Sequence, residues 1–134
     1  MSLPDNGKEK GRLNERRVID AIEIVRCRDP WFWWIWSVRP ATEQEDHRGI
    51  DAMLQSEIGA IIVQVKSRGR GAQEYRQRAR RCGADPRDIA IVVAPDDDEA
   101  LLRAVKGALV SVYEHRVGEQ PERLDSLGSR GEGT

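Results

Sequence analysis

The stretch Ile50–Ser67, IDAMLQSEIGAIIVQVKS, decides the fold. Two strand-like runs, 50–56 and 61–67, flank four residues that include Gly59, and a glycine supplies the positive φ that a tight turn needs. We therefore expect a β-hairpin with Ile58-Gly59 at its turn.

The hairpin register determines which side chains share a face. A turn at Ile58-Gly59 pairs Asp51 with Lys66 and makes Gln64 a diagonal neighbour of Asp51, about 7–8 Å away at Cα. Side chains alternate along each strand, so Asp51, Gln64 and Lys66 lie on one face. The opposite face is apolar, with Ala52, Leu54, Val63 and Val65. The sequence therefore predicts one face that packs and one that holds three polar groups.

Hydrophobic periodicity predicts the elements around the hairpin. Helices are expected over about 12–28, 73–82 and 96–115, a strand over the aromatic run 31–38, a polar loop over 42–49 and a buried strand over 89–94. The order is helix, three strands, helix, strand, helix. We expect an α/β domain with helices packed on a mixed four-stranded sheet, in which three strands form a meander and the fourth joins in parallel through a right-handed crossover.

Length and composition indicate one globular domain. The chain has 134 residues, 34% of them charged and 39% hydrophobic, with a formal net charge of −1, and this size suits a single core. We expect a flexible leader over 1–10, the folded domain over 11–116 and a disordered tail over 117–134, which is rich in Gly, Ser and charge.

Several classes of protein are excluded by pattern. Cys27 and Cys82 lie far apart, outside any CxxC motif, which excludes a structural zinc site and a disulfide framework. No apolar run approaches the roughly 18 residues of a membrane span. Two reduced thiols and no signal segment lead us to expect a cytoplasmic protein without membrane contact.

The polar face of the hairpin carries groups with complementary chemistry. A carboxylate from Asp51 and an amide oxygen from Gln64 are hard ligands suited to Mg²⁺. A lysine beside a metal, here Lys66, positions or deprotonates an attacking water or neutralises a charged transition state. The alternative is that Asp51 and Lys66 form a simple cross-strand ion pair on a solvated face.

Glu15 adds a second acid to this pattern. It lies on the same helical stripe as Val18, Ile19 and Ile22, a side of the helix where charges are rarely placed without a partner. We interpret it as an outer ligand that orients a metal-bound water. The alternative is an acid favoured by the helix dipole in the first turn.

Together, Glu15, Gly49-Ile50-Asp51 and Gln64-Val65-Lys66-Ser67 resemble the active-site signature of the PD-(D/E)XK nuclease superfamily. The element order is similar to that superfamily's restriction-endonuclease-like αβββαβα core, and the resemblance covers about Arg12 to Ala94. It implies hydrolysis of DNA phosphodiester bonds with Mg²⁺ or Mn²⁺. It further implies Asp51 and Gln64 as metal ligands, Lys66 as catalytic lysine and Glu15 as an auxiliary acid at the metal.

The sequence departs from this signature at two positions. Ile50 replaces the proline, and Gln64 stands where Asp or Glu is usual. The Gln-x-Lys form resembles the Mrr-like restriction branch, whereas the chain's size is similar to that of archaeal-type Holliday junction resolvases. A neutral ligand removes one negative charge from the metal site and should weaken metal affinity.

A basic segment follows the catalytic strand. Between Lys66 and Arg81 there are seven basic residues and one acid, Glu74. Such a stripe would neutralise phosphates and make binding salt-dependent; a solvated helix face is the alternative. The residues we expect to bind nucleic acid are Arg68, Arg70, Arg76, Arg78, Arg80 and Arg81.

Several other polar and aromatic residues lie near the predicted site or on the predicted strands. His47 and Asp46 lie in the loop before Asp51, where they either contact phosphate or belong to an ordinary surface. The tryptophans of 31–36 are interpreted as core or dimer interface, with base stacking as the alternative. His115 ends a helix and receives no role.

The leading hypothesis is a DNA endonuclease of restriction, repair or recombination type, acting as a homodimer because a short chain offers one site and duplex cleavage often needs two. The second hypothesis is a non-catalytic nucleic-acid-binding module of the same fold, which the neutral Gln64 favours. The third is a structural dimer built on the tryptophan-rich strand.

Overall fold

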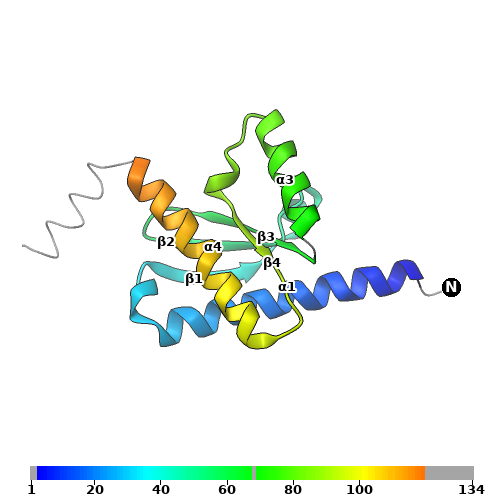
Figure 1. The fold of residues 1–134 in the computed structure, drawn as a ribbon, viewed down its shortest axis with the longest axis horizontal. Helices are drawn as coiled ribbons and strands as arrows, with labels where there is room; N and C mark the ends of the chain where they lie inside the picture. Colours follow the sequence, from blue (N-terminus) through cyan, green and yellow to red (C-terminus); the bar gives the residue numbers. More distant parts are fainter. Residues whose placement is uncertain (1–2, 68, 120–134) are drawn as a thin grey trace, which may run out of the picture.

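The computed structural model describes residues 3–67 and 69–119 (Figure 1). Within these residues the chain forms four helices, two short 3₁₀ turns and four strands. The helices are α1 (Leu3–Arg28), α2 (Glu43–His47), α3 (Gly69–Arg81) and α4 (Asp98–Glu119), and the 3₁₀ turns are η1 (Pro30–Phe32) and η2 (Pro86–Asp88). The strands are β1 (Ile35–Pro40), β2 (Ala52–Ser56), β3 (Ile61–Lys66) and β4 (Ala90–Val93).

The strands form one open mixed sheet in the order β1-β2-β3-β4. β1 and β3 both run antiparallel to β2, and β4 runs parallel to β3. This confirms the predicted α/β class, the three-stranded meander and the parallel fourth strand. β1 and β4 are the two edges of the sheet.

Helices α1 and α4 pack together against one face of the sheet. Their buried side chains recur at helical spacing, Val18, Ala21, Ile22 and Val25 on α1 and Leu101, Val105, Leu109 and Val112 on α4, as an amphipathic helix requires. They meet Leu54 and Val63, both 0% exposed, from the predicted apolar face of the hairpin. We call this side of the sheet the packed face.

Helix α3 lies apart from α1 and α4, next to β3 and β4 (Figure 1). It contacts the opposite side of the sheet, because a Cβ added at Gly71 would lie 3.6 Å from the side chain of Lys66. Among the side chains of α3, Ala72 is buried. We call this side of the sheet, which carries Gln64 and Lys66, the polar face.

The hairpin register differs from the prediction by two residues. Ala52 pairs with Val63 and Leu54 with Ile61, so Asp51 lies next to Gln64 rather than opposite Lys66. The turn is centred on Glu57-Ile58, with Gly59 N donating to Ser56 O at 3.1 Å and Gly59 at φ +101°. Burial of Ile58, which is 5% exposed, favours this turn. A shift of two residues preserves the faces, so the predicted alternation is confirmed.

Local capping corrects two of the predicted elements. Asp29 caps a 3₁₀ turn with Pro30 at its start, so the aromatic run begins as η1 and becomes a strand only at Ile35. Thr42 and Glu45 form a capping box, which makes α2 where we predicted a loop.

The tryptophans divide between the core and the surface. Trp34 is 1% exposed, whereas Trp31, Trp33 and Trp36 are 45–58% exposed. The β1–β2 register shifts between Ile35 and Ser37, so Trp36 occupies a bulge on an edge strand. A core role is therefore confirmed for Trp34 alone among the four.

Helices α1 and α4 extend beyond their predicted limits. α1 begins at Leu3, inside the predicted leader; Lys8, Glu9 and Lys10 are good helix formers, and Pro4 falls in the first turn, where its missing N–H costs no bond. α4 runs to Glu119, into the predicted tail, and Val117 is 6% exposed. Residues 120–134 of that tail lie outside the described residues. Among the described helices, none is both long and apolar enough to cross a membrane.

Candidate metal and nucleic-acid site

Three carboxylates converge where α1, α2 and the start of β2 meet. Glu15, Asp46 and Asp51 each offer an oxygen, and these oxygens all lie within 4.8 Å of one another. Glu15 and Asp51 were selected from the sequence as site residues, whereas Asp46 was left as either a phosphate contact or ordinary surface. We call this set the carboxylate cluster.

Asp51 is held by the backbone of two neighbouring strands. Its N–H donates to Val63 O at 3.2 Å, and its carbonyl accepts from Ala41 N at 3.3 Å. Val65 N donates to Asp51 Oδ2 at 2.7 Å. Among the described residues no donor bonds Oδ1, so one carboxylate oxygen is fixed and the other is open to a ligand.

Helix α2 positions Asp46, and its first turn is tied to β1. Arg39 donates to both carboxylate oxygens of Glu45, at 2.7 and 2.9 Å, and Thr42 N donates to the same side chain at 2.8 Å. These bonds lower the pKa of Glu45 to about 2, with the Arg39 bond as the largest cause. A five-residue helix is thereby anchored at a defined place beside Asp51.

The end of α2 turns the chain directly into Asp51. Gly49 has φ +83°, and its N–H donates to Asp46 O at 2.9 Å while Ile50 N donates to Glu45 O at 3.0 Å. This is the Schellman pattern, in which glycine takes the left-handed conformation after a helix. The Thr42–Glu45 capping box and Gly49 were the sequence signals that would have placed Asp46 in the site.

Burial and crowding make the carboxylate cluster electrostatically strained. Burial raises the pKa of Glu15, and the charges of Asp51 and Asp46 raise it further against the opposing effect of Arg12. Burial also raises the pKa of Asp51, against the Val65 amide and the charge of Lys66. A bound cation would relieve both effects, because it favours the ionised form of every acid around it.

Gln64 is the one member of the predicted motif with an unmet hydrogen bond. Its side chain is 4% exposed, and Oε1 has no hydrogen-bond partner among the described residues. Leaving a buried amide oxygen unpaired costs free energy. Because the register puts Gln64 next to Asp51, this oxygen is a natural further ligand for a cation held by the carboxylate cluster.

Lys66 lies beside the carboxylate cluster, on the side covered by α3. Its Nζ is 5.3 Å from the centroid of the Tyr75 ring, which is cation–π geometry. Burial raises the pKa of Tyr75, and the charge of Asp51 raises it further, so Tyr75 faces the same site. No sequence pattern indicated Tyr75, because its place depends on how α3 packs.

A groove of about 640 Å³ opens beside the carboxylate cluster. Its walls are α1, the end of β1 and α2, and its lining includes all three clustered acids together with Arg12, Arg16 and Asp20. Lys66 does not line this groove. The groove therefore reaches the three acids without contacting Lys66.

The predicted basic surface divides between two flanks of α3. Arg70 pairs with Glu74 at 3.3 Å, and the charge of Arg78 acts on Tyr75, on the flank near Lys66. Arg76 and Arg80 line a different groove, against β4 and α4. Arg81 is exposed at the end of α3, and Arg68 lies outside the described residues. The single stripe expected from the sequence is therefore split.

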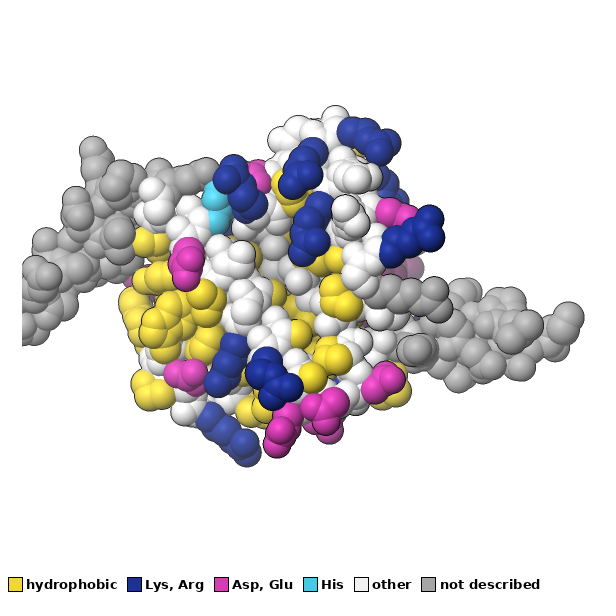
Figure 2. Space-filling model, in the orientation of Figure 1, with side chains coloured by type: hydrophobic (Ala, Val, Ile, Leu, Met, Phe, Trp, Pro, Cys, Tyr) yellow, Lys and Arg dark blue, Asp and Glu magenta, His cyan; other side chains and the backbone are white. Residues whose placement is uncertain are grey.

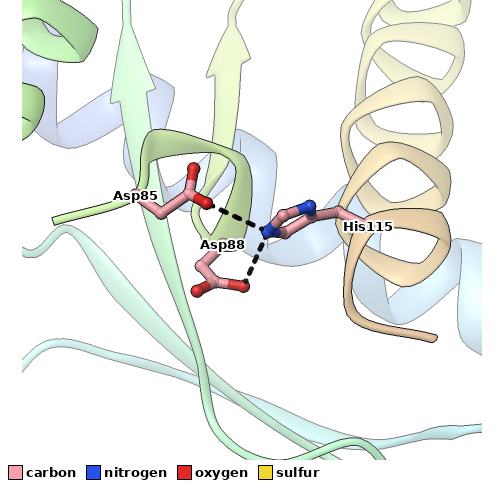
Figure 3. Close-up of side chains that lie close together, drawn as sticks. All are labelled: Asp85, Asp88 and His115. Atoms are coloured by element: carbon pink, nitrogen blue, oxygen red, sulfur yellow. Dashed lines mark ion pairs between the residues drawn. The ribbon is translucent and has the colours of Figure 1, made fainter. Parts of the chain in front are cut away.

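A second group of metal-ligating side chains joins η2 to α4 (Figure 3). His115 Nε2 lies 3.2 Å from Asp85 Oδ2 and 3.5 Å from Asp88 Oδ1. Arg87 bonds both oxygens of Asp85, and Arg116 contacts Asp88 at 3.4 Å. Two guanidinium groups already balance the two carboxylates, so we interpret this cluster as an ionic anchor for η2, which gives His115 a structural role that the sequence did not indicate.

Comparison with known proteins identifies no relative. No protein-family model matches the chain, and no match was found among curated proteins or solved structures. The interpretation of the site therefore depends on its own geometry.

Proposed function

We propose that the protein is a metal-dependent nuclease that hydrolyses DNA phosphodiester bonds, with a PD-(D/E)XK site in a restriction-endonuclease-like core. The observation that carries this proposal is the convergence of Glu15, Asp46 and Asp51 within 4.8 Å, next to Gln64 and Lys66. The three acids come from separate parts of the chain, and burial raises the pKa of two of them. Acids gathered and perturbed in this way are typical of functional sites.

The donor set fits a hard divalent cation such as Mg²⁺ or Mn²⁺. Asp51 offers the open Oδ1, Glu15 and Asp46 offer carboxylates, and Gln64 offers an unpaired buried amide oxygen. Oxygen ligands of this kind are the ones Mg²⁺ prefers. When bound, such an ion supplies Lewis-acid polarisation of the phosphate and a more acidic water.

Separate residues of the chain would bind the water, stabilise the phosphate charge and attract the DNA. Glu15 accepts a hydrogen bond from the attacking water, a role open to a carboxylate that lies within the cluster and lines the groove. Lys66, stacked on Tyr75, places a positive charge beside Asp51 and stabilises negative charge that develops on the phosphate. Arg78 and Arg81, both exposed on α3, attract the DNA backbone.

A non-catalytic nucleic-acid-binding module is the second candidate. Two observations favour it: Gln64 is neutral, and Lys66 does not line the groove that holds the acids. In this case the basic side chains of α3 bind the phosphate backbone without cleavage. Salt-sensitive DNA binding with no cleavage in Mg²⁺ or Mn²⁺ identifies this function.

Cleavage assays on branched, linear duplex and single-stranded DNA test the proposal. We expect cleavage that requires Mg²⁺ or Mn²⁺, and we expect Asp51→Asn and Lys66→Met to lose about 10³-fold in rate, the scale for removing a group that stabilises charge in the transition state. Asp51→Asn keeps an oxygen that can accept from Val65 N, so the fold should survive.

Asp20→Asn is the matched control for the cleavage assay. Asp20 lines the same groove but pairs with Arg16 at 3.6 Å and lies outside the carboxylate cluster. We expect it to cleave at the wild-type rate. Equal loss in the Asp20 and Asp51 variants, or activity within a few-fold of wild type in both Asp51→Asn and Lys66→Met, would contradict the assignment.

A further inference from the structure

A second groove, of about 450 Å³, lies between α3, the edge strand β4 and α4 (Figure 2). Its apolar lining comes from Ile89, Ile91 and Val93 on and beside β4, and α4 contributes only small residues there, namely Ala104, Gly107, Ala108 and Ser111. The small residues recur at i, i+3, i+4 and i+7, so they form one face of the helix. Another helix could approach α4 closely along this face.

The rim of this groove is basic, and two of its arginines form no ion pair with a described residue. Arg76, Arg80 and Arg87 line it. Arg87 is engaged by Asp85, whereas Arg76 and Arg80 have no ion pair with any described residue. Figure 2 shows basic side chains over α3 on one side of the hollow. Two unpaired guanidinium groups beside an apolar floor favour an occupant that is acidic as well as apolar.

The chain itself carries a matching acidic segment. Asp96 lies just before α4, and Glu99 lies in its first turn. Neither carboxylate forms an ion pair with a described residue, although the neighbouring Asp98 pairs with Arg17. Figure 2 shows acidic side chains gathered at the lower edge, where α4 begins. We call Asp96–Glu99 the acidic start of α4.

The two charged regions lie toward opposite ends of α4. Arg87 belongs to η2, which the His115 and Arg116 contacts fix against the C-terminal half of α4 (Figure 3). Arg80 and Arg87 line a common hollow, so Arg80 lies near the same end. A copy of α4 packed antiparallel on the small-residue face would bring its acidic start toward these arginines, and twofold symmetry would form the same contact twice.

We propose that this groove is the contact between two copies of the chain, related by a twofold axis, with α4 packed against α4 and the arginine rim of each copy facing the acidic start of the other. The proposal does not depend on nuclease activity. Because opposite charges meet at the rim, association should weaken as salt concentration rises.

The exposed tryptophans are the competing surface. Trp33 and Trp36 are each 58% exposed, and aromatic side chains are common in interfaces. However, the bulge at Trp36 interrupts the edge strand that a partner would extend. For the groove, the arginine rim and the acidic start of α4 supply the charge complementarity on which the proposal rests.

Sedimentation velocity of the full chain across the micromolar range, at low and high salt, tests the proposal. We expect a salt-sensitive dimer. Arg76→Glu/Arg80→Glu should raise the dissociation constant of the dimer by more than about tenfold. The control is Arg78→Glu/Arg81→Glu, which makes an equal charge change on α3 away from the groove. It should leave the dissociation constant unchanged. Adding Asp96→Lys/Glu99→Lys to the first variant should restore dimerisation.

Gly107→Gln tests the apolar contact without threatening the fold. A Cβ at Gly107 would meet nothing within 4 Å, and replacing a helical glycine raises helix propensity. We expect a variant with unchanged or higher melting temperature that is monomeric. A monomeric wild type, a dimer that survives Gly107→Gln, or a dimer lost in Trp33→Ser/Trp36→Ser but kept in Arg76→Glu/Arg80→Glu would overturn the proposal.

Discussion

The two faces of the β2–β3 hairpin carry side chains from the same two strands, but one face packs against helices and the other holds polar groups. On the packed face, Leu54 and Val63 are 0% exposed and meet the apolar stripes of α1 and α4. On the polar face, Gln64 is 4% exposed with an unpaired oxygen, beside Asp51 whose pKa burial raises. The packed face buries apolar side chains against the helices, whereas the polar face buries an amide oxygen without a partner among the described residues and a carboxylate.

The difference between the faces shows that the polar face lowers the stability of the fold. Buried polar groups without partners and buried charges are costly, and their costs are tolerated when another face supplies enough packing. Such local violations are expected at functional sites. The cost on the polar face is therefore the physical argument that Asp51 and Gln64 belong to a site, and it is open to measurement.

Adjacent substitutions on β2 should give the largest difference between the faces. We expect Leu54→Ala to lose about 3 kcal/mol of unfolding free energy, because it leaves a cavity in the core. Met53→Ala, at the next position on the half-buried polar face, should lose about 1 kcal/mol. Urea unfolding followed by circular dichroism measures both. Equal losses would contradict the division of the sheet into two faces.

Replacing Gln64 should sharpen the comparison by improving the polar face. Gln64→Met keeps the length of the side chain and removes the unpaired oxygen, so we expect it to gain about 1 kcal/mol of stability in metal-free buffer. Val63 is the preceding residue on β3, and its side chain lies on the packed face. We expect Val63→Ala to lower the free energy of unfolding. A Gln64→Met protein less stable than wild type in the same urea titration would mean that Oε1 has a favourable role in the metal-free fold.

Glu15 should show the smallest effect and a defined pH dependence. Because its folded pKa is raised above 4.5, ionising Glu15 costs more in the folded than in the unfolded chain. That cost is absent below pH 4.5 and grows as pH rises through the folded pKa. Glu15→Gln removes it, so in EDTA we expect a melting temperature a few degrees above wild type at pH 7.

Differential scanning fluorimetry from pH 4 to pH 8 checks the Glu15 prediction. The difference between Glu15→Gln and wild type should shrink as pH falls and vanish below the ordinary pKa. Asp20→Asn, on the same helix but exposed, should show no such trend. A Glu15→Gln protein that is less stable than wild type at neutral pH would show that the carboxylate is favourably paired rather than crowded.

Local alternation made the hairpin and its two faces predictable from the sequence. Asp51, Gln64 and Lys66 share a face because side chains alternate with a period of two, and an error of two residues in the register leaves that parity unchanged. The register itself was not predictable, because burial of Ile58 at the turn depends on the assembled core. Glu15 was predictable because it shares a stripe with Val18 and Ile22.

The rest of the candidate site depends on contacts between distant elements. Asp46 enters the carboxylate cluster through α2, a helix held by a capping box and by Arg39, a residue outside the helix. Tyr75 enters through the packing of α3, which no local pattern specifies. Arg76 and Arg80 line a groove with β4 and α4 because of their position around the α3 helix, and a count of basic residues does not reveal this position.

Calorimetric titration of the full chain with Mn²⁺ tests most directly whether the polar face is a metal site. We predict one bound ion per chain in the wild type and in Asp20→Asn, and loss of binding in Asp51→Asn, with each protein folded as judged by circular dichroism. Equal binding by the wild type and Asp51→Asn, or no binding by the folded wild type, would contradict this account.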